Sequence, residues 1–145
     1  MTAFVLDTSC IIAAVCSWHE HCARASAEIE RRLSRRESLV CAAPALIESY
    51  SVLTRLPAPH RLSPANALEL LDANFMRGRR IVALDGAATA SLLRSAPENE
   101  IAGGRTYDAV IVACARKARA RAILTFDADD FGSLADSSLE IVIPS

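Results

Sequence analysis

The sequence has a single lysine, no long apolar run and no basic segment at its start, and each of these absences argues against a class of protein. Lys117 is the only lysine, and the formal net charge is -1 with a pI near 6.3, so global charge does not indicate a nucleic-acid-binding protein. No apolar run reaches the roughly 18 residues that a membrane-spanning helix needs. No basic segment precedes the first apolar residues, which Asp7 soon interrupts, so we expect no secretory signal. We therefore expect a soluble, cytoplasmic protein.

The five cysteines include no Cys-x-x-Cys pair, and their odd number argues against a disulfide framework. We expect most of them to be small buried residues in a reducing compartment. Cys16, His19, His21 and Cys22 lie close enough in sequence to suggest zinc, but they lack the paired spacing of structural zinc sites. A loop at the rim of a site is the favoured interpretation, from which either histidine could contact a ligand. Trp18 is also open to two interpretations, as a base-stacking or a core residue.

The pattern of apolar runs indicates one α/β domain without repeats. At 145 residues with 52% hydrophobic residues, the chain is long enough for a core of its own. We expect strands at 4–6, 39–42, 81–84, 122–125 and 141–143, and helices at 9–15, 22–36, 44–56, 63–76 and 87–94. A buried helix follows, with Thr106 as its cap. Short apolar strands alternating with helices predict a parallel sheet with right-handed βαβ connections.

Two acids follow predicted strands directly. Asp7 comes after Phe4-Val5-Leu6, and Asp127 comes after the strand at 122–125. An acid in such a place can cap the next helix or face a ligand at the carboxyl edge of the sheet, and for Asp7 alone the two interpretations are even. The second strand-end acid favours the ligand. Asp129 and Asp130 crowd the same loop as Asp127.

Two further acids lie near helix starts, and each has an ordinary explanation. Asp108, in the first turn of the buried helix, could simply complement the helix dipole. Leu46, Ile47 and Tyr50 share one face of their predicted helix, and Glu48 falls nearly opposite, which favours an ordinary surface glutamate.

These acids indicate a single site only if the fold brings their carboxylates close together. Two carboxylates 4 Å apart repel by about 4 kcal/mol at an effective dielectric near 20, so a cluster of four needs a compensating cation. Carboxylate-rich ligation selects hard ions such as Mg²⁺ or Mn²⁺, which support phosphodiester hydrolysis.

The order of these acids resembles the PIN domains, and within them the VapC-type toxins of bacterial toxin–antitoxin pairs. The match runs through Val5-Leu6-Asp7-Thr8-Ser9, Ile47-Glu48, Gly104-Arg105-Thr106-Tyr107-Asp108-Ala109, and Leu124-Thr125-Phe126-Asp127 followed by Asp130-Phe131. It covers nearly the whole chain. The resemblance implies a single PIN domain over residues 1–145, a three-layer sandwich whose five-stranded parallel sheet has the order 3-2-1-4-5.

The resemblance also implies the roles of the acids. Asp7 and Asp108 would be the main ligands of Mg²⁺, with Mn²⁺ as the alternative, and Glu48 and Asp127 would complete the pocket. Ser9 and Thr125 would lie behind the ligands and fix the carboxylates by hydroxyl hydrogen bonds. Asp130 belongs to the same outer group, and either Asp129 or Asp130 could replace Asp127 as the fourth acid.

The function implied by the resemblance is that of a Mg²⁺-dependent endoribonuclease toxin, acting on tRNA, ribosomal RNA or other structured RNA. A cognate VapB-type antitoxin would neutralise it, and the toxin would form a homodimer, or a heterotetramer or larger assembly with that antitoxin. The alternative is a non-catalytic PIN-like module that binds RNA or protein. A response-regulator receiver is a remote alternative, because the sequence lacks an acidic pair before the first helix and the expected lysine.

Overall fold

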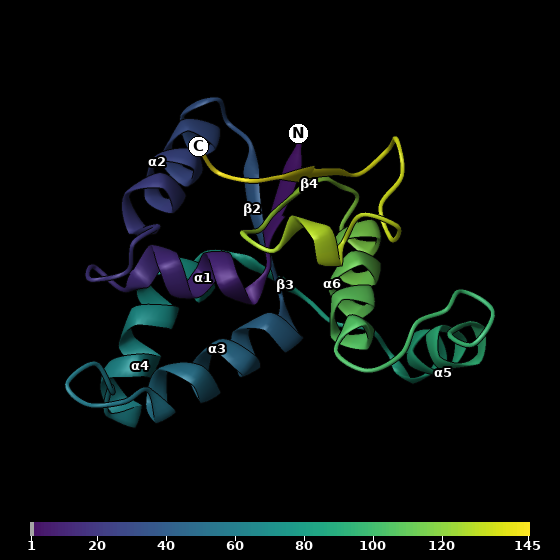
Figure 1. Cartoon of the computed structure of the whole chain (residues 1–145). Helices are drawn as coiled ribbons and strands as arrows, with labels where there is room; N and C mark the ends of the chain where they lie inside the picture. Colours follow the sequence, from purple (N-terminus) through teal and green to yellow (C-terminus); the bar gives the residue numbers. More distant parts are fainter. Residues whose placement is uncertain (1) are drawn as a thin grey trace.

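β1 (Ala3–Leu6) is the central strand of a five-stranded sheet with the order β3-β2-β1-β4-β5. The other strands are β2 (Ser38–Ala42), β3 (Arg80–Val82), β4 (Ala120–Leu124) and β5 (Glu140–Val142), and every neighbouring pair is parallel. The computed structural model describes residues 2–145 (Figure 1). Its topology confirms the predicted fold. Because strand order reverses between β1 and β4, the residues that follow these two strands meet at the switch point.

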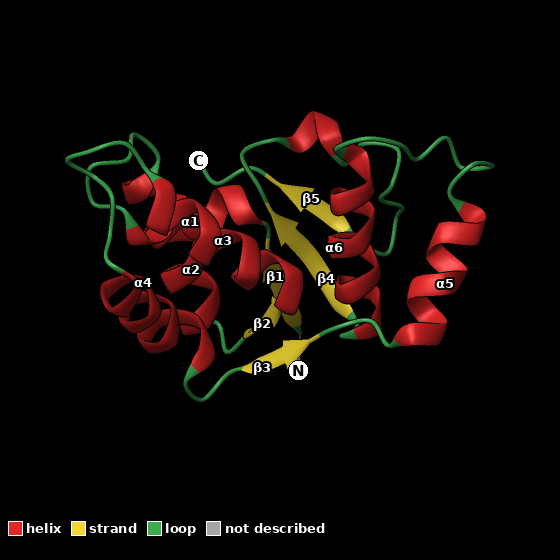
Figure 2. Ribbon diagram, turned by 90° about the horizontal axis from the view of Figure 1, so that it is seen from below, coloured by secondary structure: helices red, strands yellow, loops and turns green. Residues whose placement is uncertain are grey.

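Helices cover both faces of the sheet (Figure 2). In that view α1 (Thr8–Val15), α2 (Cys22–Ser34), α3 (Ala43–Arg55) and α4 (Pro64–Leu71) lie together on one side of the strands. On the other side lies α6 (Arg105–Lys117), with α5 (Gly86–Ser95) outside it. Burial on both faces explains the nearly continuous apolar runs of the central strands. Phe4, Ile123 and Leu124 are completely buried.

The single helix predicted over 63–76 is wrong in its second half. α4 ends at Leu71, and a π-helical turn, η1 (Asp72–Met76), follows it. The Arg77 amide donates to the Asp72 carbonyl at 2.8 Å, which closes this wider turn and brings Phe75 into the core. The Cys41 thiol of β2 donates to the Phe75 carbonyl at 3.1 Å. Sequence periodicity does not distinguish such a turn from a continuing α-helix.

Two other predicted details also differ from the structure. α6 begins at Arg105 after Gly104, so Thr106 lies inside the helix and does not cap it. β3 ends at Val82, two residues earlier than predicted, because the chain must leave the sheet for Asp85 to accept from the Ala88 amide and cap α5. Neither difference moves a predicted site residue.

The buried face of α3 is only partly the predicted one, since Leu46 is buried as expected but two of its predicted neighbours are not. Ile47 is 71% exposed and Tyr50 is 39% exposed, whereas Ala45 and Ser49 are fully buried. The buried stripe also includes Leu46 and Leu53, so it overlaps the predicted face and is rotated away from Ile47 and Tyr50. As a result Glu48 flanks the buried stripe and does not lie opposite it.

Arginine runs in the sequence are partly used within the fold. Glu28 is buried on α2 and forms ion pairs with Arg31 and Arg32, and Arg32 also pairs with Glu37 at 2.9 Å.

None of the helices within residues 2–145 has the length and apolar character that crossing a bilayer requires. All five cysteines are free, and all but Cys22 are buried, as predicted.

Glu28→Gln is expected to lower the free energy of unfolding by about 1.5 kcal/mol, because a neutral amide cannot replace charge-assisted hydrogen bonds to two guanidinium groups. Urea denaturation measures the change. Glu30→Gln is the matched control, since Glu30 is exposed on the same helix and its substitution should stay within about 0.5 kcal/mol. Equal losses in both variants would show that the buried ion pairs do not stabilise the fold.

Candidate active site

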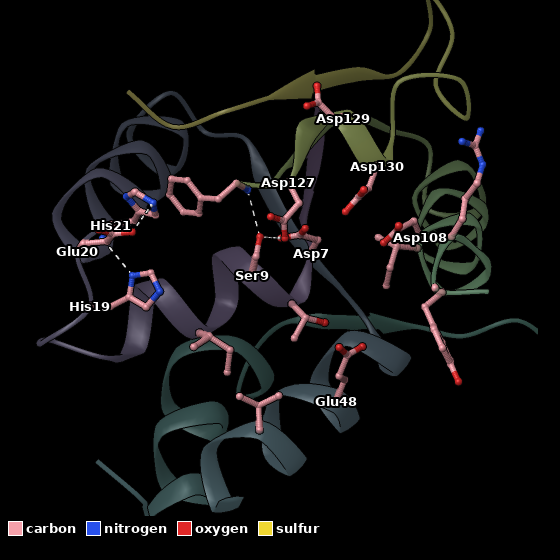
Figure 3. A pocket seen from close by; sticks show the side chains of 18 residues that line it. Asp7, Ser9, His19, Glu20, His21, Glu48, Asp108, Asp127, Asp129 and Asp130 are labelled. Atoms are coloured by element: carbon pink, nitrogen blue, oxygen red, sulfur yellow. Dashed lines mark hydrogen bonds and ion pairs between the residues drawn. The ribbon is translucent and has the colours of Figure 1, made fainter. Parts of the chain in front are cut away.

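A cavity of about 800 Å³ lies beyond the carboxyl ends of β1 and β4. Figure 3 shows that Asp7, Glu48 and Asp108 face it from separate elements, together with Asp127. The acids that line it are Asp7 after β1, Glu48 on α3, Asp108 in the first turn of α6, and Asp127, Asp129 and Asp130 after β4. The fold therefore gathers side chains from four separate parts of the sequence around one space.

Asp7 caps a helix and also faces the cavity, so the two interpretations of its position do not exclude each other. Its Oδ1 accepts from the Cys10 amide at 2.9 Å, which caps α1, while the residue also lines the cavity. Oδ1 also accepts from the Ser9 hydroxyl at 2.7 Å, and Oδ2 accepts from the Thr125 hydroxyl at 2.5 Å. Burial raises the pKa of Asp7, and these hydrogen bonds only partly oppose it. The carboxylate is therefore held rigidly, with lone-pair capacity left on Oδ2.

The same two hydroxyls tie the start of α1 to the loop after β4. The Phe126 amide donates to Ser9 Oγ at 3.1 Å, and the Asp127 amide donates to Thr125 Oγ1 at 2.9 Å. Each hydroxyl thus donates to Asp7 and accepts from the β4 loop. This arrangement contains the hydrogen bonds expected of Ser9 and Thr125, and it fixes the position of Asp127 relative to Asp7.

The pKa of Asp108 shows how the acids of the cavity affect one another. Burial raises its pKa to about 6, with further contributions from Asp130, Asp7, Asp127 and Glu48, in that order. Four carboxylates from three other segments therefore disfavour its charged form. Such mutual repulsion is relieved when a cation enters the site.

No basic side chain neutralises this cluster within the described chain. None of the salt bridges within residues 2–145 involves the six acids of the cavity. Arg105 lines the same cavity, but its Nε has no hydrogen-bond partner. The described residues include no group of three or more His, Cys, Asp or Glu side chains that could by themselves hold an ion. The oxygen-only acids and the open cavity fit Mg²⁺ or Mn²⁺, since Mg²⁺ usually takes one or two carboxylates and keeps several waters.

The loop after β4 offers two acids beside the main pair. Asp127 contributes to the raised pKa of Asp7, and among the carboxylates Asp130 has the largest effect on the pKa of Asp108. In Figure 3 the Asp130 carboxylate lies between Asp127 and Asp108, whereas Asp129 points away from them. Geometry therefore favours Asp127 and Asp130 over Asp129, a distinction that the sequence did not provide.

The other end of the cavity has a different chemistry. His19, Glu20, His21 and Phe126 line it, as the rim loop predicted from the sequence suggested. Trp18 is 47% exposed and so is not a core residue. Sequence reasoning missed His60, which stacks on Trp18 from a distant loop, because no local motif connects the two residues.

The stability of the metal-free protein is expected to fall as pH rises through about 6. The folded pKa of Asp108 is raised above its ordinary value, so its contribution to stability is complete below about 4 and is lost above about 6. Thermal unfolding in EDTA at pH 5 and pH 7.5 should show a larger loss for the natural protein than for Asp108→Asn.

Divalent ions should reverse this loss, because they favour the charged carboxylates. We expect Mg²⁺ or Mn²⁺ to raise Tm more at pH 7.5 than at pH 5, and not to do so in Asp108→Asn. Glu30→Gln, outside the cavity, should respond like the natural protein. A Tm gain from metal that is equal at both pH values would contradict this account.

A family profile, sequence relatives and solved structures all match this chain over most of its length. The sequence profile of the PIN domain matches residues 4–136. Ribonuclease VapC40 of Mycobacterium tuberculosis is 37% identical over 125 residues, which span 83% of this chain and 84% of the relative. The crystal structure of M. tuberculosis VapC20, a sarcin–ricin-loop-cleaving toxin, has a TM-score of 0.69 at 15% identity, covering 92% of this chain and 97% of that one. VapBC2 from Rickettsia felis, bound to a DNA fragment from its promoter, gives 0.70 at 15% identity, covering 99% and 100%.

Proposed function

Because this chain belongs to the PIN domain family and is a VapC-type member of it, we propose that it is a divalent-metal-dependent endoribonuclease and the toxin of a toxin–antitoxin pair. The observation that supports this most strongly is the set of carboxylates that share one cavity without a basic partner among residues 2–145. Such a set is costly for stability and is explained by ion binding. We further propose that residues 1–145 form a single PIN domain.

In this proposal Asp7 and Asp108 hold Mg²⁺, which Mn²⁺ can replace. A bound divalent ion supplies positive charge to the scissile phosphodiester and lowers the pKa of the attacking water. Glu48 and Asp127 complete the pocket and orient water through their carboxylate oxygens. Asp130 adds negative charge beside Asp108.

Ser9 and Thr125 act through Asp7 in the proposed site. Each hydroxyl donates to one Asp7 oxygen and accepts from the loop that carries Asp127. Their role is to hold the two acids at a fixed separation before an ion binds, which reduces the entropic cost of forming the site.

We propose RNA as the substrate, a cognate VapB-type antitoxin as the inhibitor and the cytoplasm as the place of action. Five free cysteines are consistent with a reducing compartment. A homodimer is supported by a largely apolar groove that Pro44, Ile47, Leu93 and Val110 help to line, because Ile47 and Leu93 are each more than half exposed in the single chain. The antitoxin would add to this dimer to give a heterotetramer or a larger assembly.

The proposal is tested by incubating the purified chain, freed of any partner, with end-labelled structured RNA. We expect cleavage with Mg²⁺ or Mn²⁺ and none with EDTA. Cleavage that persists in EDTA would exclude a metal-dependent mechanism. RNA binding without cleavage at any metal concentration would favour the non-catalytic module.

A further inference from the structure

All three histidines of the chain and its single tryptophan gather at one place beside the acidic cavity. The loop between α1 and α2 supplies Trp18, His19 and His21, and the loop between α3 and α4 supplies His60. In Figure 3, His19 and His21 lie at the end of the cavity opposite Asp108. Neither the core nor the proposed ion site explains why these rings are collected there.

The rings form a continuous row that leads to the acids. Trp18 stacks on His60 with centroids 4.0 Å apart and planes 22° apart, and His19 lies 5.8 Å from Trp18. His21 follows at 5.5 Å from His19 and stacks on Phe126 at 4.4 Å and 18°. Phe126 precedes Asp127 directly, so the ring row, which we define as His60, Trp18, His19, His21 and Phe126, ends beside the carboxylates.

Hydrogen bonds hold the middle of the ring row in place. The His21 amide donates to His19 Nδ1 at 3.0 Å, so the proton of the neutral His19 ring is on Nε2, which is left as a donor. The Arg24 guanidinium donates to His21 Nδ1, and the Glu20 carboxylate lies 3.3 Å from His21 Nε2. At the end of the row the Phe126 amide donates to Ser9. Ordered rings lose little conformational entropy when a ligand stacks on them.

The outer rings are open to a ligand. Trp18 is 47% exposed and His60 is also exposed, so their mutual stacking leaves ring surface in solvent. Flat aromatic rings with free faces offer a stacking surface to a ligand. They suit a nucleobase, whose stacking on an aromatic ring is worth about 1–3 kcal/mol and depends little on the base.

We propose that the ring row is a nucleobase-binding subsite, which seats the base of a nucleotide flanking the scissile phosphate of a single-stranded RNA segment. This inference rests on the proposed ribonuclease function and adds where the substrate strand lies. The strand enters over Trp18 and His60 and passes His19 and His21 to reach the acids. His19 Nε2 offers a donor to an acceptor on the strand as it passes.

Trp18 provides a direct readout because it is the only tryptophan. Titration of the full chain with a short, non-cleavable 2′-O-methyl oligonucleotide, with Ca²⁺ in place of Mg²⁺, should quench its fluorescence as binding proceeds. Fluorescence anisotropy of a labelled oligonucleotide gives the Kd independently. Trp18→Phe keeps an aromatic face and should stay within about 3-fold, whereas Trp18→Leu should weaken binding about 5-fold to 100-fold.

Leu68→Ala is the control for removal of an exposed apolar side chain, since Leu68 is 53% exposed on α4 and is not part of the ring row. It should bind like the natural protein. Circular dichroism melting checks that Trp18→Leu is folded, and His60→Ala gives a second test of the same subsite with Trp18 intact.

The outcomes separate this inference from the proposed function. Quenching together with loss of affinity in Trp18→Leu supports the subsite. Suppose that RNA is cleaved in a metal-dependent way, but the oligonucleotide binds without quenching Trp18 or binds Trp18→Leu with natural affinity. This result would overturn the subsite and leave the ribonuclease function in place. Quenching by a protein partner but not by the oligonucleotide would also overturn it. If the 2′-O-methyl oligonucleotide does not bind and RNA is not cleaved, both the subsite and the proposed ribonuclease function would be overturned.

Discussion

Asp108→Asn and Asp7→Asn are each expected to lower the single-turnover rate of RNA cleavage by about 1,000-fold. Asparagine keeps the shape of aspartate but removes the negative charge that attracts the ion, whose electrostatic stabilisation of the transition state is worth several kcal/mol. A loss of about 4 kcal/mol corresponds to about 1,000-fold in rate. The measurement uses end-labelled RNA with enzyme in excess, at several Mg²⁺ concentrations.

The pattern across metal concentration shows whether the loss arises from the ion. If the acids bind the ion, raising Mn²⁺ should recover part of the activity of Asp108→Asn, which keeps the other carboxylates of the cavity. Asp72 lies in η1, pairs with Arg77 and does not line the cavity, so Asp72→Asn should cleave at the natural rate. Natural rates in both Asp7→Asn and Asp108→Asn would remove the proposed mechanism.

Thr125→Val should lower cleavage by about 10-fold to 100-fold, although Thr125 is completely buried and does not line the cavity. Valine matches threonine in shape but cannot donate to Asp7 or accept from the Asp127 amide. Loss of such a supporting hydrogen bond typically costs that factor in metal affinity or activity. Isothermal titration with Mn²⁺ should show weakened binding in proportion to the loss of rate.

Thr125→Ser separates the hydroxyl from the methyl group. Serine keeps the hydrogen bonds, so its activity should return to within about 3-fold of the natural protein even though a small buried void lowers stability by about 1 kcal/mol. Should the serine and valine variants lose activity equally, packing and not the hydroxyl would be what Thr125 contributes.

The parallel sheet could be expected from apolar runs that alternate with helices, whereas the strand order and the convergence of Asp7 with Asp127 were implied only by the resemblance to the family. Apolar runs followed by acids mark strands that end at the same edge of a parallel sheet, and β1 and β4 meet there. Resemblance to the family added Glu48, whose periodicity indicated a surface position. Glu48 is exposed, as periodicity indicated, and the cavity that it lines is formed only in the folded chain.

Other features depend on tertiary contacts that no local pattern records. His60 reaches Trp18 only because the α3–α4 loop folds back beside the α1–α2 loop. The positions of Asp127 and Asp130 depend on hydrogen bonds and on a short 3-10 turn, η2 (Ala128–Asp130), that composition alone does not predict. Sequence thus supplies the acids, while their individual geometry is set by the fold.

The most direct test of the account is a crystal of this chain soaked in Mn²⁺ and measured for anomalous scattering. We predict a peak inside the acidic cavity, in contact with Asp7 and Asp108 and absent from crystals of Asp108→Asn. Mn²⁺ bound only elsewhere on the molecule, or a cavity that stays empty at a concentration supporting RNA cleavage, would contradict the claim that these distant acids form one ion site.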